Sequence, residues 1–163
     1  IVQPFAEFSA LDNVAAAALF SQPGESIASA REEARAHLAF VGLEAQCDQS
    51  AATLTLAMRK RLELAKALAM KPKLLFLDEV NAGLNSAEVE RATRLIHQLA
   101  ASGITIVMIE HLMKVVLNVC TRIVVLHNGQ LIADGAPRDV IKNPAVVDAY
   151  LGQQYAQRAG VHG

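Results

Sequence analysis

Two adjacent carboxylates, Asp78 and Glu79, follow the apolar run of residues 74–77 directly. Four large apolar residues stopped by acids predict a short strand buried on both faces, with the acids at its carboxyl end. Open α/β sheets bind ligands at that end. Because neighbouring side chains on a strand point to opposite faces, one carboxylate can bind a metal ion while the other polarises a water molecule. A strand that simply ends in solvated acids is the alternative.

A second apolar run, residues 104–109, ends in Glu110 and His111. Between the two runs, residues 85–101 show helical periodicity, and either Asn85 or Ser86 can cap the helix at its start. A strand, a helix and a second strand in this order predict parallel pairing with a right-handed crossover. Both strands would then present polar groups at equivalent places on the sheet.

The remaining pattern predicts where this sheet lies in the chain. Before Pro72 the periodicity is helical only, with a helix up to about residue 20 that Ser9 can cap, another over 25–41 stopped by Gly42, and a third over 54–70. After residue 111, we expect a short helix, a third parallel strand over 122–126, a hairpin through residues 127–133, and two short helices. The prediction is an α/β chain with a helical subdomain over 1–71, a mainly parallel sheet with flanking helices over 72–152, and a tail over 153–163.

A basic run, Arg59, Lys60 and Arg61, lies in the third of these helices. It could contact phosphate groups. Consecutive residues point in different directions around a helix, however, so the sequence favours a solvated surface on which Arg59 pairs with Glu63.

Composition sets limits on partners and location. The 163 residues carry 15 basic and 16 acidic side chains, so no overall field favours nucleic acid, and none is expected as a partner. Two distant cysteines, Cys47 and Cys120, lack metal-ligand spacing and are expected to be reduced and buried. No apolar run reaches the roughly 20 residues that a membrane span needs. The sequence predicts no signal peptide, and its first residue, Ile1, suggests that it belongs to a longer chain.

The motifs together resemble the ATP-binding-cassette (ABC) transporter ATPases. Residues 74–79 are similar to the Walker B motif of that family, residues 81–85 to its D-loop, and residues 109–111 to its switch-histidine segment. Residues 83–85, 110–116 and 143–152 resemble the ATPase subunits of branched-chain amino-acid importers. This resemblance covers nearly the whole chain and implies a partial P-loop NTPase (RecA-like) domain.

The resemblance also implies roles for individual residues. Asp78 would hold Mg²⁺, Glu79 would polarise the attacking water, and His111 would contact the γ-phosphate of ATP. Asn85 would occupy the D-loop position that couples two ATPase protomers. Phosphoryl transfer needs a positioned water, a metal ion and hydrogen-bond donors around the spreading negative charge. The family further implies membrane-spanning permease subunits as partners, with the ATPase on the cytoplasmic, inner face of the membrane.

The sequence departs from the family in two places. It contains no GxxxxGK[ST] motif, so the Walker A loop that cradles phosphates is missing, and this chain alone is expected to bind ATP poorly and to be inactive. Where the family has a Leu-Ser-Gly-Gly-Gln signature, this chain has Leu54, Thr55, Leu56, Ala57 and Met58. Thr55 keeps a hydroxyl, but Leu56 and Ala57 replace glycines and Met58 replaces an amide, which would crowd a nucleotide bound there.

The sequence leaves three functions open. The leading one is the ATP-hydrolysing subunit of an importer of branched-chain amino acids or similar small solutes. The altered signature favours a non-hydrolytic binding or regulatory module instead. Another branch of the same family, such as lipid export, is the third. Loss of the Walker A strands would expose a sheet edge and apolar helix faces, so the isolated chain is expected to self-associate.

Overall fold

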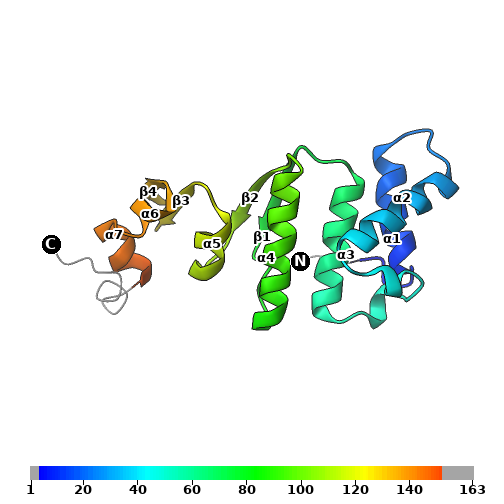
Figure 1. Cartoon of the computed structure of the whole chain (residues 1–163), viewed down its shortest axis with the longest axis horizontal. Coiled ribbons are helices and arrows are strands. Elements are labelled where there is room, and N and C mark those ends of the chain that lie inside the picture. Colours follow the sequence, from blue (N-terminus) through cyan, green and yellow to red (C-terminus); the bar gives the residue numbers. More distant parts are fainter. Residues whose placement is uncertain (1–3, 152–163) are drawn as a thin grey trace. The chain divides into compact units, whose positions relative to one another are not determined.

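The computed structural model describes residues 4–151, as helices and short strands (Figure 1). This part divides into two compact units, one ending at Ile109 and the other beginning at Glu110. The boundary predicted after residue 71 falls inside the first unit and stays a prediction. The predicted tail, residues 153–163, lies outside the described residues.

The first unit begins with helices at the predicted places. They are α1 (Ala10–Ser21), α2 (Ile27–Phe40) and α3 (Leu56–Ala69), with 3₁₀ turns at Glu44–Gln46 and Ala51–Thr53 between the last two. Each α-helix has a hydroxyl side chain as its N-cap, from Ser9, Ser26 and Thr55 respectively. These caps satisfy backbone N–H groups that a helix leaves unpaired in its first turn.

The three helices contact one another and enclose an apolar core. Leu11, Leu38 and Leu62, one from each helix, are fully buried. Asn13 is buried with them, and its side chain ties down the segment before α1. Its Oδ1 accepts a hydrogen bond from the Phe5 N–H at 2.8 Å, and its Nδ2 donates to the carbonyls of Phe5 and Ser9, each at 3.0 Å.

The strands β1 (Leu74–Asp78) and β2 (Thr105–Ile109) pair in parallel, joined by α4 (Ser86–Ala101). Leu74 lies opposite Thr105, and Asp78 lies opposite Ile109. The predicted strand–helix–strand unit with parallel pairing is therefore confirmed.

The prediction that β1 is buried on both faces is wrong. Along β1 the burial alternates, so that Leu75 and Leu77 are buried while Phe76 is 68% exposed. On β2, Ile109 is 61% exposed. A helix that joins two parallel strands covers one face of their sheet. In the described part of the chain, the other face keeps its large apolar side chains exposed.

The second unit consists of short elements. These are α5 (Met113–Val119), β3 (Ile123–His127), β4 (Gln130–Gly135), α6 (Pro137–Val140), α7 (Pro144–Val146) and a π-helical turn (Val147–Leu151). The predicted hairpin is confirmed, since β3 and β4 are antiparallel around Asn128 and Gly129, which both have positive φ. The predicted parallel pairing of the third strand with the first sheet would join the two units, and it stays a prediction. Within its own unit β3 pairs with β4, because a two-residue turn satisfies its backbone groups locally.

No helix within the described residues is long and apolar enough to cross a bilayer. Cys47 is buried and Cys120 partly buried, both as free thiols, and burial raises the pKa of each thiol. The expectation of burial is met for Cys47 and in part for Cys120.

Candidate functional site

The acid pair lies where the sequence places it, at the carboxyl end of β1. Asp78 is the last residue of the strand and Glu79 follows it, and both side chains are exposed. The Glu79 N–H donates to the carbonyl of Ile109 at 3.0 Å, which extends the parallel ladder by one bond beyond the strand. Both carboxylates are therefore presented at the sheet edge where α/β proteins bind ligands.

A tight turn follows the acid pair. Glu79 itself has a φ of 45°, in the left-handed region that side-chain-bearing residues seldom occupy, and Gly83 has a φ of 76°. The Ala82 N–H donates to the Glu79 carbonyl at 3.0 Å, and the Leu84 N–H donates to the Asn81 carbonyl at 3.2 Å. Two consecutive reversals of this kind fold the D-loop-like segment back toward the start of α4.

Lys60 of α3 holds this turn from the side. Its ammonium nitrogen lies 3.4, 2.9 and 2.6 Å from the carbonyl oxygens of Glu79, Val80 and Ala82. This contact cannot be predicted from the sequence, because every residue has a backbone carbonyl that can accept a hydrogen bond.

Arg61 is likewise structural, and it is partly exposed. Its guanidinium donates to the carbonyls of Val41 at 3.2 Å and Gly42 at 2.8 Å, at the carboxyl end of α2. Burial, followed by repulsion from Arg91, lowers the pKa of this guanidinium. The predicted pairing of Glu63 with Arg59 is not the one observed, since Glu63 accepts from Lys66 at 2.9 Å.

Asn85 caps α4 in a reciprocal capping box. Its Oδ1 accepts from the Glu88 N–H at 3.0 Å, and the Glu88 carboxylate accepts from the Asn85 N–H at 2.9 Å. The alternative cap, Ser86, is already inside the helix. Asn85 thus fixes the point at which the D-loop-like segment ends.

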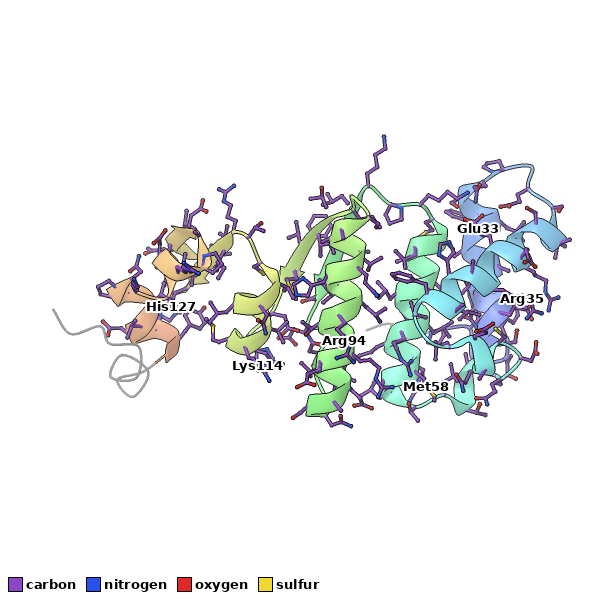
Figure 2. All side chains as sticks on the ribbon, viewed as in Figure 1. Glu33, Arg35, Met58, Arg94, Lys114 and His127 are labelled. Carbon is purple, nitrogen blue, oxygen red and sulfur yellow. The ribbon has the colours of Figure 1, made fainter. Side chains whose placement is uncertain are left out.

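The signature-like residues form the start of α3. The Thr55 hydroxyl accepts from the Met58 N–H at 3.3 Å, so it serves as the helix cap. Leu56 is 47% exposed, and one of its δ-methyl groups lies so close to Gly83 that a Cβ there would be 3.0 Å from it. Ala57 and Met58 are partly exposed, and Figure 2 shows Met58 near the lower end of α3. The start of α3 therefore contacts the turn after the acid pair.

His111 belongs to the second unit, close to its start. The Glu110 carboxylate accepts from the backbone N–H groups of His111, at 3.2 Å, and Leu112, at 3.4 Å, just before α5. Within the first unit, the structure places Leu56 of the signature-like residues against Gly83, in the segment between the acid pair and Asn85. Because His111 lies in the other unit, its predicted action with Glu79 on one nucleotide stays a prediction.

The side chains at this site fit the predicted Mg²⁺ better than the predicted ATP. Mg²⁺ is commonly held by one or two carboxylates together with phosphate oxygens, which the exposed carboxylate of Asp78 fits. Within residues 4–151 no group of three or more His, Cys, Asp or Glu side chains gathers to form a metal cage. For ATP the chain supplies the start of α3, where Leu56 is 47% exposed, and its 163 residues contain no GxxxxGK[ST] sequence.

Two protein-family models match parts of this sequence. Residues 2–82 match the model described as "ABC transporter", and residues 130–156 match that of the "Branched-chain amino acid ATP-binding cassette transporter". The chain belongs to the ABC transporter ATPase family. The solved ADP conformation of MJ1267, an ATP-binding cassette of an ABC transporter, agrees with this placement at 29% identity and a TM-score of 0.77, over 93% of this chain and 66% of that one.

Among the curated ABC ATPases, relatives with different transport systems are similar to this chain. The high-affinity branched-chain amino acid transport ATP-binding protein BraF of Pseudomonas aeruginosa is 36% identical, over 93% of this chain and 65% of the relative. The lipopolysaccharide export system ATP-binding protein LptB of Acidithiobacillus ferridurans is 34% identical, over 93% and 62%. The chain thus spans a little under two thirds of the length of these relatives.

Proposed function

We propose that this chain works as part of the ATP-hydrolysing subunit of an ABC transporter that imports branched-chain amino acids or similar small solutes. The observation that carries the proposal is the acid pair at the carboxyl end of β1, held beside β2 and followed by a capped α4. In this proposal Asp78 binds Mg²⁺, Glu79 polarises water and His111 donates to the γ-phosphate. The match of residues 130–156 supports the amino-acid branch.

The proposed partners follow from the same assignment. A second ATPase protomer would meet the signature-like residues 55–58 and Asn85, and membrane-spanning permease subunits would hold the ATPase at the cytoplasmic face of the membrane. ATP and Mg²⁺ would be the cofactors. Because the chain has no GxxxxGK[ST] motif, we expect residues 1–163 alone to bind ATP weakly and to lack turnover.

The test uses the product of the complete reading frame that contains this sequence, assembled with its permease subunits. ATP turnover should be stimulated when a branched-chain amino acid is supplied with its binding protein. Glu79→Gln should abolish turnover and leave ATP binding intact, while Glu90→Gln, an exposed glutamate on α4, serves as the matched control. Stimulation by a lipid in place of an amino acid would support the export branch, and turnover by the Glu79→Gln protein would refute the role of Glu79.

A second candidate, a non-hydrolytic binding or regulatory module, is favoured by Leu56 lying against Gly83 where the family has a glycine. In that case the unsubstituted protein should show no turnover. Replacing Leu56 and Ala57 with glycine should not restore it. Turnover that appears in this double variant would instead show that the site is intact apart from crowding.

A further inference from the structure

The contact between Lys60 and the turn after the acid pair joins two elements that sequence alone leaves unrelated. Three carbonyl oxygens, those of Glu79, Val80 and Ala82, converge on one ammonium group within 3.4 Å. An ammonium group carries three N–H donors, which matches three acceptors that approach from different directions. A lysine side chain that only extended into solvent would not have three backbone carbonyl oxygens around its ammonium group.

The turn needs this support because of its backbone. Glu79 has a φ of 45°, and a residue with a side chain keeps this conformation only where its surroundings enforce it. The Glu79 carbonyl accepts from both the Ala82 N–H and the Lys60 ammonium. These two bonds fix the peptide that follows Glu79 and, with it, the direction in which the carboxylate leaves the chain.

We propose that Lys60 is a positioning residue for Glu79, which it sets by clamping the backbone of the 79–82 turn. The proposal deepens the proposed function and rests on it for the role of Glu79 toward water. Leu56, one turn before Lys60 on α3, lies against Gly83 and makes a second contact with the same segment. A displacement of the start of α3 would therefore also move the 79–82 turn, and the Glu79 carboxylate with it.

The first test needs only the present chain. Lys60→Met removes the ammonium and keeps the side-chain length, while Arg59→Met removes a charge from the neighbouring exposed position. Hydrogen exchange is followed at the Ala82 and Leu84 amides, whose bonds close the turn. Because Lys60→Met removes hydrogen bonds from a charged group, we expect these amides to exchange about tenfold faster than in the unsubstituted chain. In Arg59→Met we expect their exchange rates to be unchanged. Equal rates in the two variants would overturn the proposal.

Amides in α1 report whether the variant still folds. If Lys60→Met loses protection there as well, Lys60→Arg replaces it, with the same measurement. A planar guanidinium cannot bring three donors to one point, so exchange in the turn should still be faster than in the unsubstituted chain. Unchanged exchange in a folded Lys60→Arg chain would count against the clamp.

The second test separates positioning from the proposed function. In the product of the complete reading frame, Lys60→Met should lower kcat and leave KM for ATP unchanged, because the clamp orients Glu79 without contacting the nucleotide. Equal kcat values would overturn the positioning role. If the unsubstituted protein has no turnover, the proposed function fails, while the exchange measurement still decides whether Lys60 holds the turn.

Discussion

Large apolar side chains fill a core between the helices α1 to α3, while others on the strands β1 and β3 are exposed. Leu11, Leu38 and Leu62 in the helices are fully buried, whereas Phe76 of β1 is 68% exposed and Leu126 of β3 is 59% exposed. Three helices can cover one another's apolar faces. A two-stranded sheet has two faces and two edges, and one connecting helix covers a single face. The helices therefore form a self-sufficient core, and the strands offer apolar surface to further polypeptide.

The largest expected difference comes from truncating one apolar side chain in each region. Leu62→Ala should lower the free energy of unfolding by about 2–5 kcal/mol, because it leaves a cavity among three helices. Phe76→Ala, on the bare face of the first sheet, should change the stability of the monomer by less than about 0.5 kcal/mol. Urea denaturation of both variants measures the contrast. Similar losses would mean that the face of Phe76 is covered in solution.

A polar residue of the helical core should matter almost as much. Asn13→Ala leaves the Phe5 N–H and two carbonyls without their buried partner, which should cost about 1–3 kcal/mol. The same substitution at Asn118, an exposed residue of α5, is the control. An unchanged free energy of unfolding in Asn13→Ala would show that water replaces the amide and that this end of the core is accessible to solvent.

The exposed strand face should make the isolated chain self-associate. Phe76→Lys should weaken association about tenfold, since burial of a Phe side chain contributes roughly 1.5–3 kcal/mol. Phe20→Lys tests an aromatic side chain that is 85% exposed in the helical region, and it should have no such effect. Light scattering over a concentration series gives both values. A monodisperse monomer of the unsubstituted chain would remove the basis of this prediction.

The smallest expected effect is electrostatic and belongs to the helices. Partial burial raises the pKa of Glu33, but hydrogen bonds from Gln22, Lys71 and His37 lower it by more, so the folded-state pKa lies below its ordinary value. The stability from Glu33 is therefore complete above the ordinary pKa and is lost as the pH falls through the folded-state pKa. Glu33→Gln should flatten the acid limb of a plot of unfolding free energy against pH.

The matched control for this prediction lies in the hairpin. Hydrogen bonds from Arg122 lower the pKa of Asp134, but this ion pair is at the surface, where such pairs contribute little. Asp134→Asn should therefore alter the acid limb less than Glu33→Gln. The opposite order would show that the hairpin, and not the helical core, limits stability in acid.

The sequence predicted the features that depend on neighbours along the chain. Ser9 and Asn85 were expected as caps and are caps, and the Asn128-Gly129 turn was expected and is present. These signals act over three or four residues, so no knowledge of the rest of the fold is needed. The acid pair was placed correctly for the same reason, because a strand stopped by carboxylates must present them at its end.

The errors concern features set by distant parts of the chain. Burial of Phe76 depends on what covers the strand, and its hydrophobicity alone could not show that one face is bare. Lys60 was treated as one member of a basic run, since its three acceptors are backbone carbonyls from another element. Asn13 was overlooked because a buried amide in a helix has no distinctive spacing.

The parallel register of β1 and β2 has a consequence for the order of folding. During synthesis β1 leaves the ribosome before α4 and β2, so the edge that pairs with β2 stays open until Ile109 has emerged opposite Asp78. The contacts among α1, α2 and α3 are complete by Ala69 and can form earlier. Helical contacts also form faster than parallel pairing, which must close a longer loop. A nascent chain would therefore carry a finished helical core and an unpaired apolar strand, and this interval is when it most needs protection from aggregation.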